Sequence, residues 1–334
     1  MTLHPSTIND QFGRQFTSLR LAVNERCNLR CVYCMSEDKI FPPDETLLSV
    51  QEQLRLISIV STLGVHKIRL TGGEPLLHPH ILSIVKGAAD TPKIQSVHLT
   101  TNGVLLAKMA ADLKASGLSG VNISLDSLNG DTFKRVTRRP FLERVMDGVD
   151  AALGVGFDTV KINAVAMRGT TEVELPKFVD LVMAHPITVR FIELMPFDDQ
   201  QIWKTGQFLR SAHFSAMLRD QFPEFEHTSG GPTEHVAFQH PQGKGKIAFI
   251  PAYSRDICGR CNRFRITADG MLRNCLYAKQ EVNLKTLLKA DVADEVIAET
   301  IQNCMWHKPI DGWAAQRALP TDTTLRKSMS QIGG

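Results

Sequence analysis

The sequence lacks the features that would place it in or across a membrane. No uninterrupted apolar run approaches the roughly 18 residues that a membrane-spanning helix needs. Residues 1–16 show no basic start followed by an apolar stretch, so no secretory leader is visible. We therefore expect a cytoplasmic location and no membrane partner.

The chain also lacks an excess of charge of either sign. Its 38 basic and 35 acidic residues give a net charge of +3, which is too small to indicate bulk binding to nucleic acid. Apolar residues at 43% and charged residues at 22% exclude extended disorder and coiled-coil classes. The charge is locally concentrated, because five arginines and only two aspartates lie between Arg255 and Cys275. We expect a local anion-binding site there.

Strand-like and helix-like segments alternate over residues 19–195. Short apolar or β-branched runs occur at residues 19–23, 67–71, 96–100, 120–125, 159–165 and 188–194. Helix-period segments lie between them, at residues 50–63, 78–89, 105–116, 142–153 and 172–184. Six strands that alternate with helices predict a parallel sheet of the α/β class. An open partial (β/α)6 TIM-like barrel and a doubly wound sheet both satisfy this pattern, since six strands are two short of a closed barrel.

The alternation changes after Pro196. Residues 208–222 and 292–305 have a helical pattern, and short strand patterns occur at residues 235–238, 246–251, 264–267 and 271–274. We therefore predict two domains: a partial barrel over residues 12–200, and a smaller C-terminal α+β domain over residues 201–334.

Six of the seven cysteines fall into two groups, which indicates metal or redox chemistry rather than disulfides. The first group, Cys27, Cys31 and Cys34, has C-x3-C-x2-C spacing directly after the first predicted strand. Three thiolates on one loop can hold three irons of a cubic [4Fe–4S] cluster and leave the fourth iron open to a small molecule. The alternative is a zinc knuckle, but structural zinc usually takes four ligands, and no fourth Cys or His lies close by in the sequence.

A glycine-containing turn, residues 72–75 (Gly-Gly-Glu-Pro), follows the second predicted strand. Its glycines would let the backbone approach a ligand closely, and their carbonyls can accept from an ammonium group, although alone the turn could be structural. Polar residues also occur near other strand ends, where barrel enzymes build their active sites. They include Thr100, Ser124, Lys161, Asn163 and Arg190. Met195 lies at the last of these strand ends, although a lone methionine is more typical of core packing.

The second cysteine group is Cys258, Cys261 and Cys275, with C-x2-C-x13-C spacing. A zinc site would need a fourth ligand, which Cys304 or His307 could supply. Three thiolates alone again favour an iron–sulfur cluster with one open iron.

The segment Arg263-Phe264-Arg265 lies between these cysteines. Alternate residues of a strand share a face, so the two arginines are expected to point the same way. Guanidinium groups donate in a planar fork that matches phosphate oxygens, which favours a polyphosphate ligand. Alternatively, the arginines only balance the charge of a cluster or pair with surface acids.

With these motifs the chain resembles the radical S-adenosylmethionine (SAM) enzymes, whose cysteine signature has an aromatic residue before the third cysteine, here Tyr33. Among them it resembles the GTP 3′,8-cyclase family, through the stretches at residues 19–23, 67–75, 258–270 and 329–334. The resemblance runs from about residue 12 to the end. It implies conversion of GTP to (8S)-3′,8-cyclo-7,8-dihydroguanosine 5′-triphosphate, the first step of molybdopterin biosynthesis, with SAM and two [4Fe–4S] clusters as cofactors.

The resemblance also implies roles for individual residues. The SAM cluster would be held by Cys27, Cys31 and Cys34, and the second cluster by Cys258, Cys261 and Cys275. The SAM contacts would be Tyr33, Gly73, Ser124 and Met195. The GTP contacts would be Arg20, Arg69, Thr100, Lys161, Arg263, Phe264 and Arg265. The closing Gly333 and Gly334 also fit the family pattern, and we expect them to reach the active site and position GTP.

The family implies two partners besides GTP: an electron donor, and a cyclic pyranopterin monophosphate synthase that receives the product. A homodimer is left open. The chain departs from the family at Ser36, where proline is usual, at residues 137–140 (Thr-Arg-Arg-Pro), where a glycine-rich turn is usual, and at Arg260, where an acid is usual. None of these positions is an implied ligand.

Three competing functions predict different cysteine and charge patterns. A peptide-modifying radical SAM maturase usually carries more C-terminal cysteines than this chain has. A non-catalytic electron carrier would not need two open irons, and a zinc-dependent nucleic-acid-binding module would need a more basic surface. Iron analysis separates them, since about eight irons per chain are expected for the enzyme with two clusters.

Overall fold

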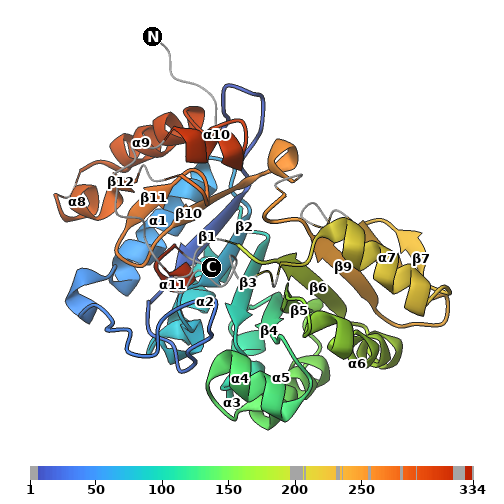
Figure 1. The fold of residues 1–334 in the computed structure, drawn as a ribbon. Helices are drawn as coiled ribbons and strands as arrows, with labels where there is room; N and C mark the ends of the chain where they lie inside the picture. Colours follow the sequence, from blue (N-terminus) through green and yellow to red (C-terminus); the bar gives the residue numbers. More distant parts are fainter. Residues whose placement is uncertain are drawn as a thin grey trace.

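Twelve strands form one sheet in the computed structural model of the chain, in the order β12-β11-β10-β1-β2-β3-β4-β5-β6-β9-β8-β7 (Figure 1). The structure describes residues 7–195, 206, 208–230, 234, 236–254, 257–278, 281–290, 292–318 and 328–332. Gly333, Gly334 and Arg255 therefore lie outside the described residues. Strands β12 and β7 end the order, so the sheet is an open barrel.

The middle of the sheet is a run of six parallel strands, each paired with the next along the chain. They are β1 (Ser18–Ala22), β2 (Lys67–Thr71), β3 (Ser96–Thr101), β4 (Gly120–Ser124), β5 (Thr159–Ala166) and β6 (Thr188–Glu193). The strands are largely buried, as expected when helices cover one face and side chains fill the other. The prediction of an open (β/α)6 partial barrel is confirmed, and the doubly wound alternative is wrong.

The connecting helices lie outside the curved sheet (Figure 1). They are α1 (Val50–Thr62), α2 (Ile81–Asp90), α3 (Leu106–Ala115), α4 (Gly130–Thr137), α5 (Leu142–Gly154) and α6 (Thr171–Ala184). Helix α1 begins with a capping box, in which Ser49 Oγ accepts from the Glu52 amide and the Glu52 carboxylate accepts from the Ser49 amide. Helix α4 was not predicted, although the Asn129 side chain caps it by accepting from the Thr132 amide.

The C-terminal strands extend both edges of the barrel. Strand β9 (Lys246–Ile250) is parallel to β6 and continues into the antiparallel β8 (Val236–Gln239) and β7 (Glu226–Thr228). At the other edge, β10 (Arg263–Ile266) is parallel to β1 and continues into the antiparallel β11 (Met271–Arg273) and β12 (Val282–Asn283). One hydrophobic core includes residues of both halves, such as Leu19, Phe249 and Phe264. The division at residue 200 therefore stays a prediction, and the sheet is continuous across it.

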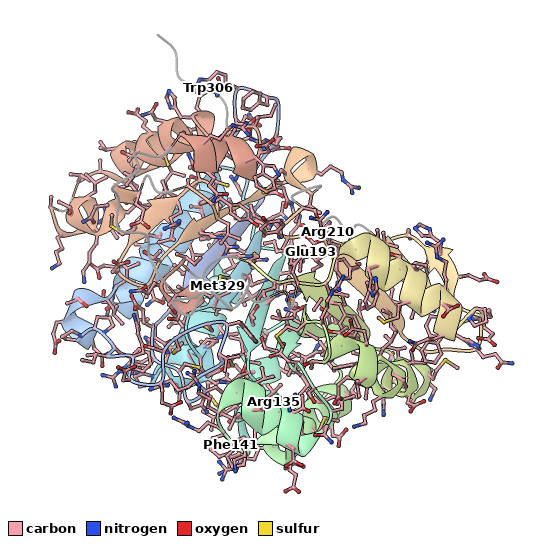
Figure 2. The ribbon with its side chains drawn as sticks, viewed as in Figure 1. Arg135, Phe141, Glu193, Arg210, Trp306 and Met329 are labelled. Atoms are coloured by element: carbon pink, nitrogen blue, oxygen red, sulfur yellow. The ribbon has the colours of Figure 1, made fainter. Side chains whose placement is uncertain are left out.

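The C-terminal helices are α7 (Ser211–Gln221), α8 (Leu284–Lys289), α9 (Asp294–Trp306), α10 (Gly312–Arg317) and α11 (Met329–Ile332). Helix α7 lies beside β9, whereas α8, α9 and α10 gather near β10–β12 (Figure 1). Figure 2 shows Met329 of α11 near the middle of the molecule and Trp306 at its outer edge. Within the described ranges, no helix combines the length and apolarity needed to cross a bilayer.

Candidate active site

The two cysteine groups lie at opposite ends of strand β1. Cys27, Cys31 and Cys34 follow the carboxyl end of this strand. The second group approaches its amino end, because β10 begins two residues after Cys261 and pairs with β1 from its first residue, Ser18. A strand of five residues is about 16 Å long. The barrel interior therefore has one group of thiols at each end.

Backbone turns and amide donors hold the thiols of the first group. The Cys34 amide donates to the Cys31 carbonyl at 2.9 Å, and Cys27 Sγ accepts from the Leu29 amide at 3.4 Å and from Asn102 Nδ2 at 3.7 Å. Burial, with help from nearby acids, raises the pKa of Cys27 to about 12 and the pKa of Cys31 well above 9. These thiols ionise only when a metal replaces the proton.

The two groups of three cysteine thiols fit an iron–sulfur cluster with several irons better than a single zinc ion. In the part of the chain that the structure describes, no three His, Cys, Asp or Glu side chains lie close enough together to hold one metal ion. Of the candidate fourth zinc ligands, Cys304 is a half-buried residue of α9 that packs against the hydrophobic core, and His307 Nδ1 lies 2.8 Å from the Asn303 carbonyl. Three spread thiols with amide donors suit a cluster in which each sulfur binds a different iron.

The glycine turn at residues 72–75 packs directly on the loop that carries the first cysteines. The Gly73 amide donates to the Asn24 carbonyl at 3.0 Å, and the Glu74 amide donates to the Arg26 carbonyl at 2.6 Å. A Cβ atom on Gly73 would lie 2.3 Å from the carbonyl oxygens of Glu25 and Arg26. Only glycine allows the two loops to approach this closely.

The Glu74 carboxylate connects the same turn to the end of strand β3 through hydrogen bonds. It is buried and accepts from Thr101 Oγ1 at 2.7 Å, from the Asn102 amide at 2.6 Å and from the Leu76 amide at 2.9 Å. Burial raises the pKa of Glu74 to about 7, although these three hydrogen bonds act in the opposite direction. Because the carboxylate is already satisfied, backbone carbonyls of the turn are the groups left to accept from a ligand.

Replacing Gly73 with alanine is expected to weaken SAM binding at least tenfold, because the added methyl group would push the turn away from the cysteine loop. Calorimetric titration of SAM into the reconstituted protein measures this effect. The matched control is Gly130→Ala on α4, where a Cβ would meet no atom within 4 Å. Wild-type SAM affinity in Gly73→Ala would contradict the proposed role of the turn.

Tyr33 links the cysteine loop to the carboxyl ends of β4 and β5. Its hydroxyl donates to Asp126 Oδ2 at 2.7 Å, and Asp126 Oδ1 accepts from the Val165 amide at 2.8 Å. Burial raises the pKa of Asp126 to about 6. Ser124, the last residue of β4, is partly exposed near this link. The predicted SAM contacts Tyr33, Gly73 and Ser124 thus all lie at the carboxyl ends of the strands.

A cavity of about 310 Å³ lies in the barrel, and all seven predicted GTP contacts line it. Its described lining includes all three cysteines of the second group and one carboxylate, Glu234. It also includes eight basic side chains, which are Arg20, Lys67, Arg69, Lys161, Arg190, Arg263, Arg265 and Lys308. Such an excess of positive charge is expected only where an anion binds.

Two buried arginines of the cavity, Arg20 and Arg69, each have a nitrogen atom without an acceptor. Burial and then the charges of neighbouring arginines lower the pKa of Arg20 well below its usual value and the pKa of Arg69 to about 9. Arg20 Nε and Arg69 Nη1 are buried without a hydrogen-bond partner. Glu234 Oε1 lies 3.2 Å from Lys161 Nζ and 3.9 Å from Arg190 Nη1, so this one carboxylate balances only part of the positive charge of the cavity. A polyphosphate would supply both the charge and the acceptors.

Several residues differ in position from the sequence prediction. Phe264 borders the cavity, but its side chain is 1% exposed and packs in the core, so only its backbone is available to a ligand. Lys161 and Arg190 are each the third residue of their strand, so they lie inside the barrel rather than at its carboxyl rim. Sequence reasoning missed Lys67 and Lys308; the position of Lys67, two residues before Arg69, was a signal that both share a face.

The second cysteine group has a more positive environment than the first. Burial acts to raise the pKa of Cys261, but the charges of Lys308 and Arg263 and hydrogen bonding to Arg263 outweigh it and lower the value to about 6. Cys258 begins a short 3-10 turn over Cys258–Arg260. At least one thiol of this group is therefore prepared to ionise before metal binds.

Helix α11 lies between the first cysteine group and the cavity. Burial raises the pKa of the Cys34 thiol, and the Ser328 side chain and the amides of Met329 and Ser330, which lie close to it, act in the opposite direction. Met329 also lines the cavity and belongs to a small apolar cluster with Met195 and Cys275. The predicted tail residues Gly333 and Gly334 follow this helix but lie outside the described residues.

Comparison with known proteins matches two family models to the chain. Residues 21–182 match the Radical SAM superfamily, and residues 187–312 match Molybdenum Cofactor Synthesis C. The crystal structure of Streptococcus suis SuiB bound to precursor peptide SuiA shares the fold, with a TM-score of 0.62 at 15% identity over 92% of this chain and 68% of that one. The fold and the first cysteine group thus define a radical SAM protein.

Curated relatives narrow the assignment. The GTP 3′,8-cyclase of Chlorobaculum tepidum is 43% identical over 98% of this chain and 97% of that protein. The GTP 3′,8-cyclase of Desulforamulus reducens is 40% identical over 97% and 99%. Human Molybdenum cofactor biosynthesis protein 1 is 40% identical over 88% of this chain and 46% of that protein. The chain belongs to the GTP 3′,8-cyclase family.

Proposed function

We propose that the barrel binds GTP with its triphosphate among the buried cations and converts it to (8S)-3′,8-cyclo-7,8-dihydroguanosine 5′-triphosphate. This reaction is the first step of molybdopterin biosynthesis, and SAM and two [4Fe–4S] clusters are its cofactors. The observation that supports the binding mode is the single cavity that joins eight basic side chains to the second cysteine group. That cavity offers both ends of a nucleoside triphosphate a partner.

Different basic residues would bind different parts of GTP. Arg20, Arg69 and Lys161 project from three strands into the barrel and would hold phosphate oxygens, with Thr100 as a further donor. Arg263 and Arg265 share a face of β10 and would hold the end of the nucleotide nearest the second cluster. The guanine would meet the open iron of the cluster held by Cys258, Cys261 and Cys275. The sugar would then face the first cysteine group.

The first cysteine group would hold the other iron–sulfur cluster, and SAM would bind beside it. Cys27, Cys31 and Cys34 would hold the cluster, while Tyr33, Gly73, Ser124 and Met195 would contact SAM. When bound, the pair would supply a one-electron reductive cleavage of SAM to methionine and a 5′-deoxyadenosyl radical, which would take the hydrogen atom from C3′ of the ribose so that C3′ can bond to C8 of guanine. The protein orients the two reactants, excludes water from the barrel and holds the nucleotide by its phosphates.

The remaining partners follow from this reaction. We propose an electron donor for the first cluster and transfer of the product to a cyclic pyranopterin monophosphate synthase. Gly333 and Gly334 would help to position GTP, since helix α11 before them already contacts Cys34. A cytoplasmic location is part of the same proposal, which leaves a homodimer open.

One assay tests the function directly. The reconstituted protein is incubated without oxygen with GTP, SAM and dithionite, and the products are separated by chromatography and identified by mass spectrometry. The proposal expects 5′-deoxyadenosine and a cyclised triphosphate in comparable amounts. Formation of 5′-deoxyadenosine with GTP left unchanged would refute it.

Replacing Arg69 with alanine is expected to weaken GTP binding about ten- to a hundredfold, because a charge-assisted phosphate contact is worth roughly 1.5–3 kcal/mol. Calorimetric titrations with GTP and with SAM measure both affinities, and the affinity for SAM should not change. The matched control is Arg168→Ala, which removes an exposed arginine just after β5. Wild-type affinity for GTP in Arg69→Ala would show that the phosphates bind elsewhere.

A further inference from the structure

Lys308 is a buried cation that follows helix α9 and borders the cavity beside the second cysteine group. It is 3% exposed, and its ammonium donates to the carbonyl of Arg263 at 3.3 Å and to the carbonyl of Asn274. Its charge also lies 5.2 Å from the centre of the Phe16 ring. Among the described residues, no carboxylate lies within 4.0 Å of this ammonium. A buried charge of this kind is costly unless an anion is bound nearby.

The two hydrogen bonds connect Lys308 to both arms of the second cysteine group. Asn274 directly precedes Cys275, and Arg263 lies two residues after Cys261. Cys261 Sγ is 3.8 Å from the same Arg263 carbonyl that Lys308 contacts at 3.3 Å. The ammonium and this thiol are therefore at most about 7 Å apart, a distance over which charges in a buried site interact strongly.

The segment after Lys308 is held in place by Arg14. The Arg14 guanidinium donates to the carbonyls of Pro309 at 2.6 Å, Ile310 at 2.8 Å and Cys258 at 3.0 Å. Asp10 fixes this guanidinium by accepting from Arg14 Nε at 2.6 Å and from the Arg14 amide at 2.9 Å. Arg14 thus ties the Lys308 segment to the first cysteine of the group, so the ammonium is held at a fixed place beside the thiols.

We propose that Lys308 is the cationic partner of the second cluster, held by Arg14, and that it raises the reduction potential of that cluster. Three thiolates bring three negative charges to this site, and a fixed positive charge stabilises the reduced form more than the oxidised form. This inference rests on the proposed function, because it requires that Cys258, Cys261 and Cys275 hold a cluster.

The test compares three variants of the full-length, reconstituted protein. Lys308→Met removes the charge and keeps the length of the side chain, whereas Lys308→Arg keeps the charge. Lys285→Met is the matched control, because Lys285 is also buried, at 9% exposure, and its ammonium also donates to two carbonyls, of Glu45 and Leu47. Iron content and a redox titration followed by electron paramagnetic resonance are measured for each, with the two clusters distinguished by their responses to SAM and to GTP.

Lys308→Met should shift the potential of the second cluster to more negative values and leave that of the first unchanged. Loss of only the second cluster from this variant would also support the proposal, provided that Lys308→Arg and Lys285→Met keep both. An unchanged potential in fully loaded Lys308→Met, or equal effects of methionine and arginine at this position, would overturn it. A wild-type protein with only about four irons would instead refute the second cluster, and with it the proposed function.

Discussion

Replacing Cys31 with serine is expected to abolish the reductive cleavage of SAM, both with and without GTP. The first cluster depends on three thiolates from one loop, and a serine hydroxyl does not replace a thiolate as an iron ligand. The iron content should fall from about eight to about four per chain. Chromatography of 5′-deoxyadenosine after anaerobic incubation with SAM and dithionite measures the loss.

Cys304 provides the control for this experiment. It is a half-buried residue of α9 that packs against the hydrophobic core, and burial raises its pKa to about 11, as expected for a structural thiol. Cys304→Ser should keep both clusters and the wild-type yield of 5′-deoxyadenosine. If Cys31→Ser cleaved SAM at the wild-type rate, the first cysteine group would not be the SAM site.

Replacing Cys275 with serine should uncouple the cleavage of SAM from the cyclisation of GTP. The first cluster lies at the other end of β1, so SAM cleavage should continue, whereas cyclised product should fall by about a hundredfold or more. The reason is positional, since a nucleotide that loses its anchor at the second cluster no longer holds its sugar at reacting distance. Quantification of both products from one incubation gives the ratio directly.

This ratio distinguishes a substrate site from a structural site. A variant that is merely unfolded would lose both products and both clusters together. Cys275→Ser that still cyclises GTP at the wild-type rate, with about four irons, would show that the second group does not anchor the substrate.

The parallel strands were predictable because each is a short apolar or β-branched run that is followed within a few residues by glycine or polar residues. All six begin and end within one residue of the predicted bounds, since local composition determines where a buried strand stops. The two groups of three cysteines could also be predicted, because the spacing of metal ligands within one loop is a local property of the sequence. The pairing of β10 with β1 was not, because it joins segments about 245 residues apart and no local pattern records it.

Charged residues of the cavity show the same limit. Arg263 and Arg265 were found from their alternation in a strand, whereas Lys308 follows a helix and reaches the site only through tertiary packing.

Arg138 is one of the residues at which the sequence departs from the family pattern implied by the resemblance, and the structure shows what it does there. It adopts a left-handed backbone, with φ of 60°, within the segment where the resemblance implies a glycine-rich turn, and its guanidinium donates to the Met35 carbonyl at 3.4 Å.

The placement of a cysteine loop at each end of β1 restricts how the chain can change in length. Inserting one residue into this strand would move Arg20 from the barrel interior to the helix-covered face, because side chains alternate along a strand. Inserting two would restore the face but move the two metal sites about 7 Å farther apart. Substitutions are therefore tolerable along β1 where they keep the apolar and basic faces, whereas insertions and deletions between Ser18 and Ala22 are not.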